Sequence, residues 1–142
     1  MTMNRPMLIE ELLHIKAYEV DAMGIVSNIV YVKWFEDLRH VFLERFYPYT
    51  TMMKEGISPM LMKTEVAYRI PLTLFDKPAG RLWVAQMGSS KWEMEFEIAT
   101  GDQIHCTGKQ TGCMYDLNKK GPGRIPQQLV VLFKEACERC AV

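Results

Sequence analysis

The segment from residue 28 to residue 46 constrains the fold more than any other part of this 142-residue chain. Its apolar side chains recur at intervals of three and four residues, which is the spacing of one face of an α-helix. Further apolar residues widen the stripe near its start, so the first half of this helix is apolar on most sides. We therefore expect the helix to lie inside a curved sheet rather than on a flat surface. The stripe comprises Val30, Trp34, Leu38, Val41, Phe42 and Phe46, and it is widened by Ile29, Tyr31, Val32 and Phe35.

A short irregular segment with one acid precedes this helix. It contains Asp21, then Gly24, then the polar pair Ser27-Asn28 that is typical of a helix start. The first N–H groups of a helix lack intrahelical partners and carry about half a positive charge. An acid beside such donors predicts a site for attack on a carbonyl carbon. The same residues also allow a plainer interpretation, in which Asp21 only accepts hydrogen bonds within its own turn and Ser27 or Asn28 only caps the helix.

After residue 60 the apolar period changes from helical to two, which is the period of a β-strand. The clearest alternation places Trp92, Met94, Phe96 and Ile98 on a core face and Lys91, Glu93, Glu95 and Glu97 on a face in water. Between residues 7 and 18 periodicity permits a helix as well as a strand, and we favour a strand. We expect strands over 12–18, 60–70, 81–89, 91–99 and 103–115, a helical turn over 50–56, a loop over 117–124 and a terminal helix over 126–140.

Composition narrows the classes of function. The 17 Lys and Arg residues balance the 17 Asp and Glu residues, so no field of one sign attracts nucleic acid or an anionic membrane. No stretch approaches the roughly 18 apolar residues of a membrane span, and Glu10 and Glu11 interrupt any signal-like run. We therefore expect a cytoplasmic protein with one domain over 1–142. In that compartment reduced thiols are expected for its cysteines, which are Cys106, Cys113, Cys137 and Cys140.

The chain resembles the hotdog-fold acyl-CoA thioesterases of the 4-hydroxybenzoyl-CoA thioesterase type. The resemblance covers residues 12–133 and implies an α+β fold in which an antiparallel sheet wraps around a long central helix. It rests on Tyr18-x-x-Asp21-x-x-Gly24-Ile25-Val26, on Tyr31, Trp34-Phe35 and Glu36, on Tyr68-Arg69-x-Pro71 and Phe75-Asp76 in a first sheet hairpin, and on the strand ending Thr-Gly-Cys-Met-Tyr-Asp at 111–116.

The resemblance also implies roles for individual residues. Asp21 would be the catalytic acid, and the N–H of Asn28 would polarise the thioester carbonyl. Whether Asp21 attacks the thioester directly or activates water stays open. Glu36 would contact the acyl end or position water, although a salt bridge is nearly as good an interpretation. The implied substrate-binding residues are Gly24, Ile25, Val26 and Tyr31.

By the same resemblance, the expected reaction is hydrolysis of an acyl-CoA or of an acyl carrier protein thioester. It needs no metal or redox cofactor, and coenzyme A enters only as part of the substrate. The implied assembly is a homodimer or a dimer of dimers, with active sites at the interface. Many relatives carry His-Val-Asn-Asn where this chain has Ile25-Val26-Ser27-Asn28, which weakens any inference about the substrate. Two other classes stay open: a non-catalytic acyl-CoA binding or sensor domain, and a hydratase or dehydratase.

Three further sequence features give weaker indications of function. Met52, Met53, Met60 and Met62 suit an adaptable acyl pocket, but core filling is the better interpretation. Lys119, Lys120 and Arg124 suit coenzyme A phosphates, but a solvated loop is the better interpretation. Cys137-x-x-Cys140 is half of a zinc motif without its other half, so we expect two thiols on one helix face and no metal site.

Overall fold

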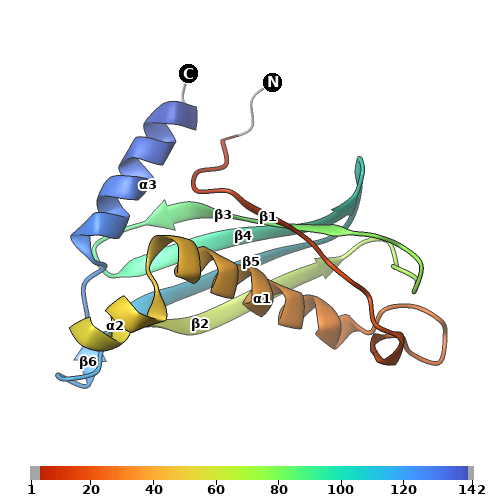
Figure 1. Ribbon diagram of the computed structural model, residues 1–142, viewed down its shortest axis with the longest axis horizontal. Helices are drawn as coiled ribbons and strands as arrows, with labels where there is room; N and C mark the ends of the chain where they lie inside the picture. Colours follow the sequence, from red (N-terminus) through yellow and green to blue (C-terminus); the bar gives the residue numbers. More distant parts are fainter. Residues whose placement is uncertain (1–3, 141–142) are drawn as a thin grey trace.

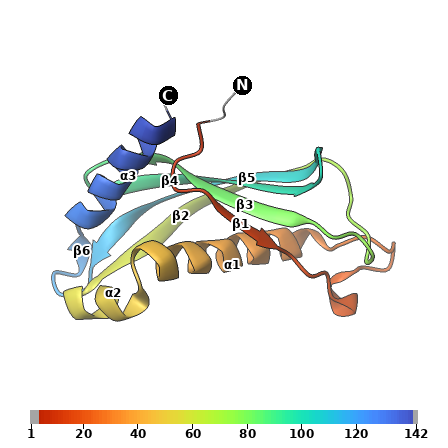
Figure 2. The same ribbon diagram turned by 45° about the horizontal axis from the view of Figure 1, so that its top comes forward.

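The computed structural model describes residues 4–140 and is organised around helix α1 (Asn28–Phe46), which lies along one face of a curled sheet (Figures 1 and 2). The helix expected over 28–46 is therefore confirmed at both ends. Its buried residues include Trp34, Phe35 and Leu38. The other elements are β1 (Ile9–Leu12), a 3-10 turn (Ala17–Glu19), α2 (Tyr49–Glu55), β2 (Ile57–Tyr68), β3 (Ala79–Met87), β4 (Lys91–Thr100), β5 (Gln103–Asp116), β6 (Gly121–Pro122) and α3 (Gln127–Cys140).

The sheet is antiparallel, with the strand order β1-β3-β4-β5-β2 and with β6 added to β5. The hairpin expected around residues 68–76 is wrong, because β2 pairs with β5 and does not pair with β3. Residues 69–78 instead carry the chain from one edge of the sheet toward the other (Figure 1). As a result β2 is an edge strand, and only one of its long sides is hydrogen-bonded within the described chain.

Two glycines of β5 leave room for close packing: Gly108 faces Phe35 of the central helix, and Gly112 faces the side chain of Trp92 on β4. A Cβ on Gly108 would lie 2.4 Å from two ring carbons of Phe35, and a Cβ on Gly112 would lie 2.3 Å from the indole of Trp92. The Phe35 ring stacks on Phe96 with centroids 4.5 Å apart. The predicted core face of β4 is confirmed, since Trp92, Met94, Phe96 and Ile98 are all buried.

The first strand lies earlier than predicted. Strand β1 ends at Leu12, and residues 13–18, expected to be extended in the sheet, leave it. The reason is the absence of a partner: Leu12 pairs with Ala79, which is the first residue of β3. One further hydrogen bond joins Leu13 N to Pro78 O, and the chain then turns toward the loop that contains Asp21.

Glu97 corrects the expectation that all four alternating β4 residues lie in water. It is 6% exposed, and its carboxylate accepts hydrogen bonds from Arg5 at 2.7 Å and Arg81 at 2.8 Å. The Arg5 guanidinium also lies over the Trp83 ring, 4.1 Å from its centroid. The segment before β1 therefore covers this part of the outer sheet face and pairs the buried charge.

Candidate active site

The loop before α1 is closed on itself and is fastened near its second end to the segment that follows β2. Val20 and Val26 form an isolated bridge, and Ile25 bridges Thr73 in the crossover segment. Val26 N also donates to Leu72 O at 2.8 Å. Gly24 has a φ of +82°, a left-handed conformation that glycine adopts without strain. The loop is therefore a tight turn of defined shape, held by the segment that follows β2.

Asp21 lies in this turn, and one of its carboxylate oxygens stabilises the turn. Its Oδ1 accepts hydrogen bonds from Met23 N at 2.8 Å and from Ile25 N at 3.3 Å. The residue is exposed, and within residues 4–140 its Oδ2 accepts no hydrogen bond. The local-turn interpretation of Asp21 is thus observed for one oxygen. The other oxygen is turned to solvent and is free to meet a substrate or a water.

The start of α1 presents uncapped backbone donors a few residues further along. Ser27 occupies the N-cap position, but its side chain makes no capping hydrogen bond. Val30 N donates to Ser27 O at 3.0 Å, which leaves the N–H groups of Asn28 and Ile29 as the unpaired donors of the first turn. Unpaired N–H groups and the positive end of the helix dipole stabilise negative charge at this point.

The residues expected to bind substrate differ in accessibility. Gly24 is exposed and Ile25 is half-buried, whereas Val26 and Tyr31 are 2% and 3% exposed. The Tyr31 ring packs edge-on against Trp34 and Tyr68. Burial raises the pKa of its phenol to about 12. Val26 and Tyr31 therefore support the loop from below in the described chain, and their contact with substrate stays a prediction.

Tyr68 is a site neighbour to which the sequence assigned no role of its own. It is the last residue of β2, and its hydroxyl donates to Asn28 O at 3.0 Å. The Tyr-Arg-x-Pro motif marked the position, but nothing in strand periodicity indicates that this side chain reaches the helix start. The contact follows from the register that places the end of β2 beside the first turn of α1.

Glu36 lies on the same helix, about 12 Å further along it. Its carboxylate accepts hydrogen bonds from Arg39 at 2.6 Å and from Gln110 Nε2 at 3.1 Å. Gln110 is fully buried on β5, and its Oε1 has no hydrogen-bond partner. The expected salt bridge of Glu36 is therefore present. The structure does not bring Glu36 together with Asp21 in one chain, so its catalytic role stays a prediction.

Exposed apolar side chains surround the Asp21 turn and continue along the free edge of β2. The contribution of β2 is strong because an edge strand lacks a neighbour to cover it. Around the turn these residues are Tyr18, Met23, Ile29 and Phe75, and along β2 and just past its end they are Met60, Leu61, Met62, Tyr68 and Ile70. Ile29 and Phe75 are 78% and 88% exposed, and exposed apolar side chains that gather in this way are typical of an interaction surface.

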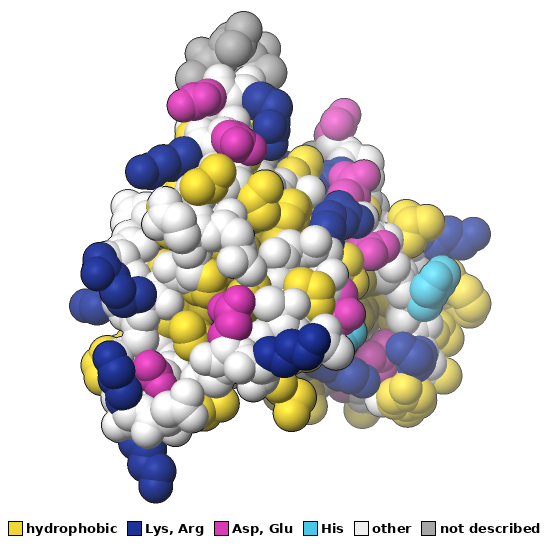
Figure 3. Space-filling model, turned by 60° about the vertical axis from the view of Figure 1, so that its left-hand side comes forward, with side chains coloured by type: hydrophobic (Ala, Val, Ile, Leu, Met, Phe, Trp, Pro, Cys, Tyr) yellow, Lys and Arg dark blue, Asp and Glu magenta, His cyan; other side chains and the backbone are white. Residues whose placement is uncertain are grey.

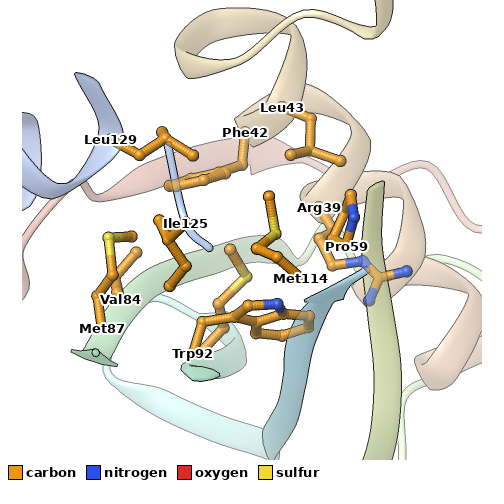
Figure 4. A pocket seen from close by; sticks show the side chains of 11 residues that line it. Arg39, Phe42, Leu43, Pro59, Val84, Met87, Trp92, Met114, Ile125 and Leu129 are labelled. Carbon is orange, nitrogen blue, oxygen red and sulfur yellow. The ribbon is translucent and has the colours of Figure 1, made fainter. Parts of the chain in front are cut away.

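A separate apolar cavity of about 30 Å³ lies under the second half of α1 (Figure 4). It is lined by Phe42, Trp92, Met114 and Leu129 among others. Of the methionines expected near an acyl pocket, Met52 is in the core, while Met53, Met60 and Met62 are exposed. The methionines that line the cavity are instead Met87, Met94 and Met114.

The basic loop over 117–124 lies at the far end of the molecule from the Asp21 turn. Leu117 N donates to Gly56 O, which places the loop beside α2 and the end of α1. Figure 3 shows this end of the molecule, where Lys and Arg side chains are scattered between apolar and neutral ones. A contact between this loop and a phosphate held near Asn28 of the same chain would have to span the length of α1.

The cysteines and the acidic residues offer no metal centre in the part of the chain that the structure describes. All four cysteines are unpaired, and no group of three or more His, Cys, Asp or Glu side chains has the geometry to hold an ion. None of the helices seen between residues 4 and 140 combines the length and apolar character of a membrane span.

An antiparallel sheet curled around a long helix is the architecture of the hotdog class of folds. Comparison with known proteins agrees: the model of the thioesterase-like superfamily matches residues 15–133, and the chain belongs to that family. A protein of Aquifex aeolicus (strain VF5), described as a "Putative esterase", is 36% identical over 122 residues, which are 85% of this chain and 94% of that protein.

Solved structures confirm the fold. A Staphylococcus aureus protein in complex with CoA superposes with a TM-score of 0.86 at 11% identity, over 96% of this chain and 87% of that one. A 1,4-dihydroxy-2-naphthoyl-CoA thioesterase from Synechocystis superposes with a TM-score of 0.79 at 12% identity, over 90% of this chain and 96% of that one. The hotdog fold implied by the resemblance is therefore confirmed.

Proposed function

We propose that this protein hydrolyses acyl thioesters of coenzyme A or of an acyl carrier protein. The observation that carries the proposal is the carboxylate oxygen of Asp21 that accepts no hydrogen bond within residues 4–140, in the tight turn that leads into the unpaired N–H groups at the start of α1. Membership of the thioesterase-like superfamily supports the reaction class. The fold neighbours include a protein in complex with CoA and a thioesterase named for a CoA ester, which supports an acyl-CoA as substrate.

In the proposed mechanism the thioester carbonyl oxygen accepts a hydrogen bond from Asn28 N–H. In one route Asp21 takes a proton from water, the hydroxide adds to the carbonyl carbon, and the oxyanion forms beside the helix start. Collapse breaks the C–S bond, and the thiolate leaves with the proton that Asp21 held. In the other route Asp21 adds directly, the thiolate leaves, and water hydrolyses the resulting anhydride. Neither route uses a metal or a redox cofactor.

The test of this function is the replacement Asp21→Asn with Asp102→Asn as its matched control. Asp102 is an exposed acid in the β4–β5 turn, and within residues 4–140 no hydrogen bond joins its carboxylate to the Asp21 turn or to the start of α1. We expect Asp21→Asn to lower kcat for thiol release by about 10²- to 10⁴-fold, the usual contribution of a general base. Asp102→Asn should match wild type. Near-normal turnover in Asp21→Asn would overturn the assignment, and an absorbance assay on an enoyl-CoA would detect a hydratase.

We further propose that the active form is a homodimer, or a dimer of dimers, in which the free edge of β2 meets a second copy. A 12-residue edge strand with exposed apolar side chains is a template for pairing with another chain. Such pairing would cover Met60, Leu61 and Met62. Light scattering after gel filtration measures the assembly, and a stable monomer at micromolar concentration would contradict it. The unpaired cysteines support a reducing compartment, which we take to be the cytoplasm.

A further inference from the structure

The Tyr68 hydroxyl joins the edge strand to the catalytic end of the central helix. It donates to Asn28 O at 3.0 Å, and Tyr68 is 45% exposed where β2 ends. Ser27, the N-cap residue, contributes no side-chain hydrogen bond to this turn. Within residues 4–140, Tyr68 is therefore the side chain whose hydrogen bond holds the backbone of the first helical turn.

The backbone directly after Tyr68 is held in place by His105. Arg69 N and Ile70 N both donate to His105 O, at 2.9 and 3.3 Å. The His105 ring is buried and bonded on both sides, with Nδ1 3.0 Å from Ile70 O and Nε2 2.7 Å from Thr100 Oγ1. With its strand end fastened to β5 in this way, Tyr68 presents its hydroxyl to the helix from a fixed position.

The hydroxyl acts on the peptide unit that supplies a free donor. The carbonyl of Asn28 and the N–H of Ile29 belong to one peptide group, next to the N–H of Asn28 itself. A hydrogen bond to the carbonyl oxygen polarises the peptide and strengthens its N–H as a donor, as in any hydrogen-bonded chain. The same bond fixes the direction in which both N–H groups point. Donors that are fixed before reaction stabilise an oxyanion without reorganisation.

We propose that Tyr68 is a positioning residue for thioester hydrolysis, whose hydroxyl orients and polarises the first turn of α1. The inference rests on the proposed function and extends it to a residue outside the acid-bearing turn. Burial raises the pKa of the Tyr68 phenol, so the group stays a proton donor at neutral pH. The Tyr31 ring supports it edge-on, with centroids 5.3 Å apart.

Replacement of Tyr68 by Phe removes the hydroxyl and keeps the ring. The matched control is Tyr49→Phe, because Tyr49 is 41% exposed and stacks on His40 at the other end of α1. We expect Tyr68→Phe to lower kcat by about five- to ten-fold, the loss of one ordinary hydrogen bond. KM should stay within about two-fold, since such a donor acts mainly on the transition state. Tyr49→Phe should keep both constants, and circular dichroism checks that both variants are folded.

A second measurement separates positioning from simple structural support. A trifluorotyrosine at position 68 ionises at lower pH than tyrosine, and a phenolate cannot donate to Asn28 O. We expect kcat, measured well below the thermal midpoint of unfolding, to fall as pH rises through this ionisation. The thermal midpoint should fall only slightly over the same range, because the folded protein loses a single hydrogen bond. The same substitution at position 49 should leave the pH profile unchanged.

The outcomes are distinguishable. If wild type releases thiol, Asp21→Asn does not, and Tyr68→Phe keeps full kcat, the proposal for Tyr68 is overturned and the thioesterase function stands. Superimposable pH profiles for the fluorinated and natural proteins would overturn it as well. If wild type hydrolyses no thioester, the function is overturned and the role of Tyr68 in it falls too. A lowered kcat in Tyr68→Phe, together with a shifted pH profile for the fluorinated protein, supports both the thioesterase function and the role of Tyr68.

Discussion

Replacement of Gly108 by Ala tests the close contact between the central helix and the sheet. The added Cβ would lie 2.4 Å from Cε2 and Cζ of Phe35, whereas ordinary contact begins at 3.4 Å. The overlap is therefore about 1 Å, from 3.4 minus 2.4. Phe35 is 0% exposed and stacks on Phe96, so its ring has no free space into which it can move. Overpacking of this kind costs about 1–3 kcal/mol, because the helix or the strand must shift.

The assay is urea unfolding at fixed protein concentration, since any assembly makes stability depend on concentration. We expect a lower midpoint at unchanged slope for Gly108→Ala. The matched control is Gly121→Ala, because a Cβ there meets nothing within 4 Å and the residue has no positive φ. The double variant Gly108→Ala/Phe35→Leu should recover part of the loss, with a coupling of at least about 0.5 kcal/mol. A midpoint like that of wild type, or purely additive losses, would refute the packing argument.

Two further predictions concern buried groups. Gln110→Glu places a second carboxylate against Glu36 and should lower the free energy of unfolding by about 2 kcal/mol or more at pH 7, with part of that stability recovered near pH 5. Gln110→Met removes an unpaired oxygen and should stay within about 1 kcal/mol of wild type in the same urea assay. Equal losses of stability in the two variants would contradict this reasoning. Burial raises the pKa of Cys106 to about 12 from 9.0, as it raises that of Tyr31 to about 12. The unfolded chain therefore loses these protons first, and stability should fall as pH rises from about 9 toward 12. Cys106→Ala should flatten that fall; an unchanged pH dependence would contradict the assignment to Cys106.

The elements with a strong local pattern of apolar residues were predictable from the sequence. The helix over 28–46 was located at both ends, because its apolar stripe is long and Ser27 and Pro48 mark its limits. The core face of β4 was also correct, since its alternation is strict. The first strand was misplaced because a strand ends where its partner strand ends. Here the partner begins at Ala79, and residues 12–18 carry no information about where that partner lies.

The burial of Glu97 also could not be predicted from the local sequence. Alternation alone assigns it to water, yet Arg5 and Arg81 come from distant segments and cover it. The same reasoning applies to β2, whose alternation predicts one buried face, although its place at the sheet edge leaves Met62 and Tyr68 exposed. Burial depends on which segments pack together, and local periodicity carries no information about that.

The candidate site divides in the same way. The sequence by itself determined that an acid, a glycine turn and a helix start follow one another, because these features are local and Asp21, Gly24 and Asn28 lie within eight residues. Only the tertiary structure decided that Tyr68 reaches Asn28, that Glu36 accepts a hydrogen bond from Gln110, and that the basic loop lies at the other end of the molecule. Those relations join residues 40 to 74 positions apart, and they depend on the crossover that sends β2 to the sheet edge.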